Sequence, residues 1–187
     1  MRWEQLFAEL EASFEAEVAA ETAAEHGSRA RAEMGAVLLV DRVRGATGHV
    51  LRVRCRGAGE VAGRLVDTGV DWWLLVDDRG RELLVATAAV LAVAGLGTGT
   101  AAPEPPSAVG RSLDLRRAVR GLARDRAPVL LRADDGGVLA GTVDRVGADY
   151  VELAEHPLDQ PRRRGAVRAV HAVPLSAIAV VVSGAGL

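Results

Sequence analysis

The sequence has 187 residues, of which 49% are hydrophobic and 3% are aromatic. These apolar side chains are numerous enough to bury a core built mainly of Val, Leu and Ala, which excludes disorder throughout the chain. The single cysteine, Cys55, excludes a disulfide framework and a cysteine-rich metal site. The net charge of −2 divides into an acidic head over residues 1–26 and a mildly basic remainder, in which every cation is Arg.

No stretch of the sequence predicts export or insertion into a membrane. After Met1 the chain turns acidic where a signal peptide would be apolar. The longest apolar run, residues 83–96, is shorter than the roughly 20 residues that a membrane helix needs. We therefore expect a cytoplasmic protein without membrane contacts.

Residues 1–27 predict an acidic amphipathic helix. Its apolar side chains recur every three or four positions, at Trp3, Phe7, Leu10 and Phe14, and Glu and Ala fill the positions between them. A face of this size needs a partner, so we predict that it binds this chain's own strands, a second copy or another protein. The acidic character argues against a lipid surface.

The rest of the chain predicts two helix-plus-strand domains, at 28–95 and 111–187, joined by a Gly- and Pro-rich linker at 96–110. In the first domain a helix from Ser28 to about Arg44 precedes strands, the first of which places Cys55 on its apolar face. In the second, a helix over 113–124, with Ser112 as its expected cap, precedes five more strands. The expected strands lie at about 49–56, 60–67, 71–77, 81–87, 89–94, 129–133, 138–146, 149–155, 167–174 and 176–182.

The two domains are copies of one unit. At a constant offset of 78 residues, glycines, an aspartate, an aromatic residue and apolar positions coincide. The offset later becomes 88, so the second copy carries ten extra residues between its third and fourth strands. The pairs at the first offset are Val53 and Leu131, Gly59 and Gly137, Gly63 and Gly141, Leu65 and Val143, Gly69 and Gly147, Asp71 and Asp149, Trp72 and Tyr150, and Leu75 and Leu153. The pairs at the second offset are Val85 and Val173, Ala89 and Ala177, and Val90 and Ile178.

A helix followed by five short strands, with glycines where the sheet must bend, predicts a small barrel in each copy. The repeated pattern Gly-x-(Leu/Val), then Gly-x-Asp-(Trp/Tyr), then Leu resembles the Sm-like branch of SH3-type small barrels over residues 37–94 and 113–182. The whole chain also resembles actinobacterial proteins sometimes labelled Fis-type transcription regulators. The loops at 68–71 and 146–149 lack the Asp and Asn of the Sm RNA-binding signature, so the resemblance implies a fold and not RNA recognition.

We find no motif that predicts catalysis, a cofactor or a metal. No phosphate-binding glycine loop leads from a strand into a helix. His156 and His171 lie near Glu155 and Asp159, but their spacing matches no familiar ligand pattern, so loop surface is the expected role. Cys55 lacks a neighbouring base and is expected to be a buried hydrophobe, with a nucleophile as the alternative.

The densest positive charge lies in and beside the insertion of the second copy. It comprises Arg145, Arg162, Arg163, Arg164 and Arg168. Such a cluster is typical of anion or nucleic-acid contacts. The alternative is an exposed hairpin tip whose charges prevent aggregation. We expect a non-enzymatic binding or assembly module that self-associates or binds a protein through sheet edges, including pairing between the two copies. The alternatives are a nucleic-acid-binding regulator using the Arg cluster and an enzyme with a site between the barrels.

Overall fold

The computed structural model describes Phe14 and residues 34–101, 113–159, 162–163 and 165–184. The chain divides into two compact units, residues 1–39 and 40–187, and all strands belong to the second. In the first unit, Phe14 is helical and 68% exposed, and residues 34–36 are also helical. Trp3, Phe7 and Leu10 lie outside the described residues, so the amphipathic face stays a prediction.

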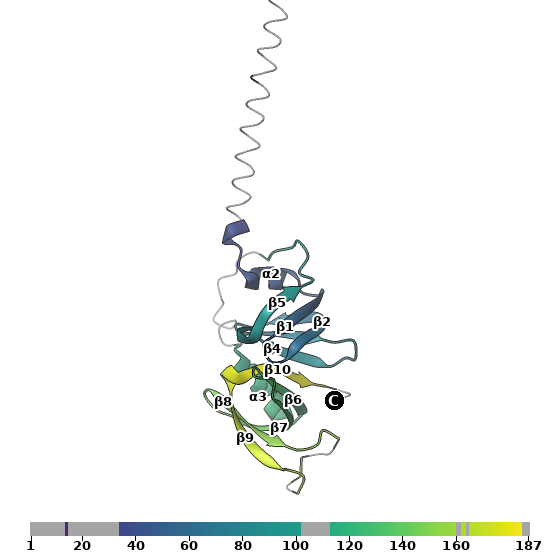
Figure 1. Ribbon diagram of the computed structural model, residues 1–187, viewed down its shortest axis with the longest axis vertical. Helices are drawn as coiled ribbons and strands as arrows, with labels where there is room; N and C mark the ends of the chain where they lie inside the picture. The colour runs from purple at the N-terminus through teal and green to yellow at the C-terminus, as the bar shows by residue number, and fades with distance from the viewer. Residues whose placement is uncertain (1–13, 15–33, 102–112, 160–161, 164, 185–187) are drawn as a thin grey trace, which may run out of the picture. The chain divides into compact units, whose positions relative to one another are not determined.

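The second unit is mainly β and consists of two strand groups, each preceded by a short helix (Figure 1). The ten strands lie close to the ranges predicted from sequence. The elements of the first group are α2 (Leu39–Gly45), β1 (Val50–Cys55), β2 (Gly59–Thr68), β3 (Trp72–Val76), β4 (Glu82–Ala86), the 3-10 turn η1 (Thr87–Ala89) and β5 (Val90–Ala94). Those of the second are α3 (Leu115–Asp125), β6 (Pro128–Ala133), β7 (Val138–Val146), β8 (Tyr150–Glu155), β9 (Ala169–Pro174), η3 (Leu175–Ala177) and β10 (Ile178–Ser183).

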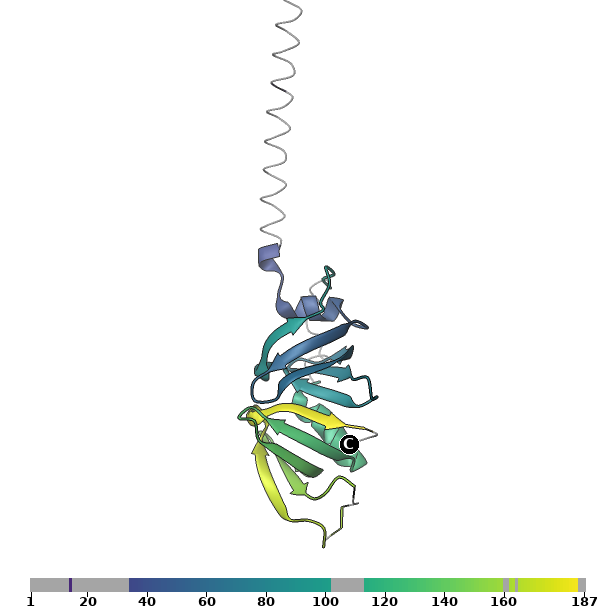
Figure 2. The ribbon, with the colours of Figure 1, turned by 45° about the vertical axis from the view of Figure 1, so that its right-hand side comes forward.

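All ten strands form one antiparallel sheet in the order β5-β1-β2-β3-β4-β10-β6-β7-β8-β9. Each group therefore has the same internal order, with its fifth strand beside its first, and the groups join through β4 and β10. Both groups curl, and β10 runs between them (Figure 2). Among the described strands neither group closes its ladder, so the expected pair of closed barrels stays a prediction.

The strand pairings match at equivalent positions of the internal repeat. In the first group Leu65 pairs with Leu75, and the ladder then slips by one residue at a bulge. In the second group their counterparts Val143 and Leu153 pair in the same way before an equivalent bulge. The pairing of Trp72 with Ala86 recurs at the second offset as Tyr150 with Pro174. The ten extra residues therefore lie in the connection between β8 and β9.

The repeated glycines stand where neighbouring backbones come closest. A Cβ at Gly63 would lie 2.7 Å from the carbonyl oxygen of Val76, and one at Gly141 would lie 2.8 Å from the carbonyl carbon of Ala154. Only glycine allows the second strand of each group to bend this tightly onto the third. Gly147 has a different reason, because its Cβ would lie 2.6 Å from an atom of the Tyr150 ring that covers it.

The interior contains two apolar cores that share a wall. The first lies among β1–β5 and includes Val180 and Val182 of β10. The second lies among β6–β8 and α3 and includes Trp72 and Leu84 from the first group. Side chains alternate between the two faces of a strand, so the β4–β10 pair has apolar residues in both cores. The two cores therefore lie on opposite faces of the β4–β10 pair.

The helices differ from prediction in detail. The helix expected over 28–44 is interrupted at residues 37–38, and α2 follows from Leu39. The predicted cap Ser112 is not described, and the observed cap of α3 is Asp114, whose carboxylate accepts a hydrogen bond from the Arg117 backbone N–H at 2.8 Å. Within the described part of the chain, no helix is long and apolar enough to cross a bilayer.

Candidate functional site

The contact between β4 and β10 is an edge-to-edge strand contact between two copies of one unit. Val85, Leu84 and Leu83 of β4 pair with Val180, Val181 and Val182 of β10. Every residue of β10 is buried. The prediction that the two copies pair with each other through sheet edges is therefore confirmed.

Two strands are left as edges of the sheet, and they are the counterparts of the strands that form this contact. By the repeat, β9 is the second copy's equivalent of β4, and β5 is the first copy's equivalent of β10. Each has one neighbour among the described strands, β8 and β1 respectively. Where β10 is wholly buried, β5 exposes Leu91, Ala92 and Ala94. The two edges of the sheet are thus formed by the repeat counterparts of the two strands that pair inside the molecule.

The free edge of β9 offers backbone donors to a further strand. The backbone N–H of Leu175 donates to Asp149 beside β8 at 2.8 Å. Donors alternate along an antiparallel strand, so the N–H groups of Val173 and His171 point to β8 and that of Ala172 points to the open side. The next outward position is Pro174, which has no N–H.

A second part of the internal contact joins two turns. The β1–β2 turn of the first group lies against the β6–β7 turn of the second, and a Cβ at Gly57 would lie 2.5 Å from the carbonyl oxygen of Ala133. The guanidinium of Arg132 also donates to the carbonyl of Ala58 at 3.3 Å. Leu130 packs against the first core from the far side of β10. Side chains of β6 in the second copy therefore contact the first copy, although β10 lies between β6 and β4.

Beside the free edge β5 lies a row of arginines that sequence patterns alone do not single out as a site. Arg52 and Arg54 of β1, and Arg56 just after it, are all exposed. Arg52 and Arg54 stand opposite Ala94 and Ala92 of β5. Among the described residues none of the three arginines has an ion pair or a side-chain hydrogen bond. The alternation with apolar residues marks them as outward-facing, but only the strand order puts them next to an open edge.

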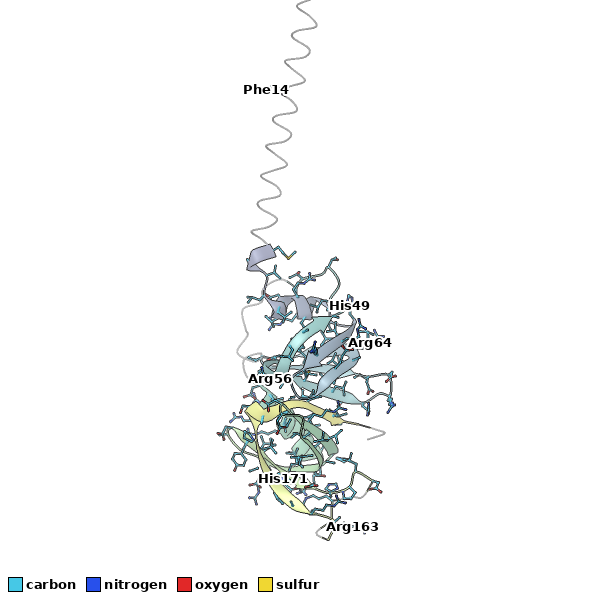
Figure 3. All side chains as sticks on the ribbon, in the orientation of Figure 1. Phe14, His49, Arg56, Arg64, Arg163 and His171 are labelled. Carbon is cyan, nitrogen blue, oxygen red and sulfur yellow. The ribbon has the colours of Figure 1, made fainter. Side chains whose placement is uncertain are left out.

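The predicted arginine cluster of the insertion is partly neutralised. Arg162 pairs with Asp144, and this hydrogen bond raises the pKa of the guanidinium above its usual value. Arg145 lies 3.7 Å from Glu152. Arg163 and Arg168 are exposed, and Figure 3 shows Arg163 at the outer tip of the β8–β9 connection. Arg164 lies outside the described residues.

The histidines of this region serve hydrogen bonds. His156 is buried, its Nδ1 lies 2.8 Å from the Pro157 carbonyl and its Nε2 lies 2.8 Å from the Thr142 hydroxyl. Since a carbonyl only accepts, Nδ1 carries the proton and the hydroxyl donates to Nε2. His171 Nε2 lies 2.7 Å from Glu155 Oε2, and this half-buried contact joins β9 to β8. No three His, Cys, Asp or Glu side chains within the described ranges gather as a metal site requires.

Cys55 has the environment of a buried hydrophobe, as the sequence predicts. It is 3% exposed, and burial raises the pKa of its thiol to about 11. The thiol therefore stays protonated at neutral pH and is a poor nucleophile.

A cleft of about 570 Å³ lies where the two strand groups and α3 meet. Asp71, Asp114, Asp149 and Arg116 are its charged lining residues. Asp71 accepts the Leu115 backbone N–H at 2.7 Å, so this carboxylate is engaged in capping α3.

Comparison with known proteins gives no family for this chain. No family model matches it, and no curated protein sequence matches it significantly.

Proposed function

We propose that this protein is a non-enzymatic assembly module that associates with further copies of itself, head to tail, through its two edge strands. In this contact β9 of one copy pairs with β5 of the next, as β4 pairs with β10 within the chain. The single observation that carries the proposal is the internal contact itself, because the chain already joins two copies of its unit by this pair of strands. Exposed edges present unpaired backbone groups that favour such pairing.

The register of the proposed contact follows from the repeat. Subtracting 88 from the β10 positions and adding 88 to the β4 positions converts one contact into the other. Val173, Ala172 and His171 of one copy would then pair with Ala92, Val93 and Ala94 of the next. The residues are smaller and more polar than the Val and Leu of the internal contact, so the contact between copies should be the weaker of the two.

The finer description of the fold belongs to the same proposal. We take each curved strand group to be a Sm-like small barrel with one open seam. At the open seam of the first group, Val180 and Val182 of β10 pack into the first core. The strand β5 of a neighbouring copy would pack against the open seam of the second group in the same way. A contact of this kind connects different surfaces of identical molecules, so it builds rings or open filaments.

Nucleic-acid binding through the insertion is the second reading, and it has less support. The ion pairs of Arg162 and Arg145 neutralise part of the cluster. A catalytic function has the least support, since the candidate nucleophile Cys55 is buried and burial raises the pKa of its thiol.

The test is the association state of the full chain, measured by sedimentation velocity over a range of concentrations. Ala172→Pro removes the outward N–H of β9 without removing a donor to β8, and proline is tolerated on an edge strand. Ala172→Ser keeps this donor and is the matched control. We expect the wild type and the serine variant to associate and the proline variant to remain monomeric. A monomeric wild type, or a proline variant that associates like the wild type, would overturn the proposal.

A further inference from the structure

We propose that the arginine row of β1 is the electrostatic half of this contact and that the acidic β6–β7 turn of the next copy receives it. The inference rests on the proposed head-to-tail association and adds what makes it specific. Its partner is a second copy of this chain, recognised by charge. The row consists of Arg52, Arg54 and Arg56, and the acidic turn carries Asp134 and Asp135.

The repeat fixes which residues would meet. Inside the chain, Gly57 lies against the backbone of residues 133–134. The counterpart of Gly57 is Asp135, and the counterpart of Asp134 is Arg56. When the same contact forms between copies, Asp135 of one copy therefore lies beside Arg56 of the next. A close approach of two backbones inside the chain becomes an approach of two opposite charges between chains.

The other two arginines follow the same conversion. Arg54 is the counterpart of Arg132, which donates to the carbonyl of Ala58 within the chain. Arg52 is the counterpart of Leu130, which reaches across β10 to the first core. Between copies, Arg52 would reach across the small Ala94 toward the half-buried Glu155–His171 pair on β8 and β9.

The charges at both edges suit this role. The arginine row is exposed and has no side-chain partner among the described residues. Asp135 is also exposed, and its only described hydrogen bond comes from the backbone N–H of Gly137 at 2.7 Å, which leaves the second carboxylate oxygen available. Figure 3 shows Arg56 and His171 in different strand groups, and β1 and β9 lie toward opposite ends of the strand order.

The side chain of Asp135 also explains how the two contacts would differ. A Cβ at Gly57 would lie 2.5 Å from the carbonyl oxygen of Ala133. Only glycine, which has no Cβ, therefore allows the two turns within the chain to come this close. Asp135 has one, so the turns of neighbouring copies must sit farther apart and be bridged by an ion pair. The contact between copies is then sensitive to salt, whereas the contact within the chain has no ion pair among the described residues.

The experiment uses two charge-reversal variants of the full chain, Arg56→Glu and Asp135→Arg. Each variant alone places like charges at every contact, so we expect its self-association to be about tenfold weaker than that of the wild type. In an equal mixture, copies that alternate have opposite charges at every contact. We therefore expect the mixture to recover wild-type association, measured by sedimentation velocity in 50 mM NaCl. Asp135→Asn keeps the turn hydrogen bond and should weaken association less than Asp135→Arg.

The outcomes separate this inference from the proposed function. If the wild type associates, Ala172→Pro abolishes association and the charge variants associate normally, then the strand contact stands and the electrostatic inference is overturned. Weak association of both single variants without recovery in the mixture also overturns it, because the two charges then do not meet. A wild type that is monomeric at every salt concentration overturns both.

Discussion

Replacing Gly141 with alanine tests whether the repeated glycines allow the sheet to bend. The new methyl group would lie 2.8 Å from the carbonyl carbon of Ala154 and closer still to its oxygen, and Cα of Glu155 would be 3.0 Å away. All of these atoms are backbone, so β8 must shift to make room. Overpacking of this kind costs about 1–3 kcal/mol, and a weakened ladder hydrogen bond adds about 0.5–1.5 kcal/mol. We therefore expect Gly141→Ala to lower the free energy of unfolding by about 1.5–4.5 kcal/mol.

The same substitution at Gly121 is the matched control. Gly121 lies within α3, and its Cβ would meet no atom within 4 Å. Alanine is the better helix former by about 1 kcal/mol, so Gly121→Ala should stabilise the protein. Urea unfolding followed by circular dichroism measures both variants. The reasoning fails if Gly141→Ala unfolds within about 0.5 kcal/mol of the wild type or if the two variants change stability in the same direction.

Two further predictions concern single side chains. Asp77 is half-buried, and its partial desolvation raises its pKa, but hydrogen bonds from the backbone and side chain of Arg81 outweigh this effect and hold the pKa below its usual value. Asp77→Asn should lower stability at pH 7 by about 1–3 kcal/mol. The folded pKa is the lower one, so this difference should shrink as the pH falls through it, and urea titrations at pH 7 and pH 3 would refute the reasoning if the difference stayed constant. Trp72 donates its indole N–H to a backbone carbonyl just before α3 at 2.9 Å, whereas the hydroxyl of its counterpart Tyr150 has no described partner. Trp72→Phe should therefore cost about 1–2 kcal/mol and Tyr150→Phe less than about 0.5 kcal/mol, as measured by thermal unfolding; equal losses would contradict this.

The sequence alone determined the local architecture of the second unit. Strand positions follow from two-residue alternation, because a strand with one buried face must alternate. The repeat followed from glycines and from the Gly-x-Asp-aromatic turn, because these positions have strict steric demands. Gly69 and Gly147 each carry a turn in which the glycine N–H donates to the carbonyl of the aromatic residue at 2.8 Å. Cys55 could be placed in the interior for the same reason of alternation.

Tertiary structure decided how the two copies meet and what their edges expose. Alternation tells which way Arg52, Arg54 and Arg56 face, but it does not tell which strand ends up at an edge. Both faces of β10 are buried although its repeat counterpart β5 is largely exposed, and the two strands differ because only β10 has β4 beside it. Neighbours distant in sequence are set by long-range strand pairing, which a local pattern does not encode.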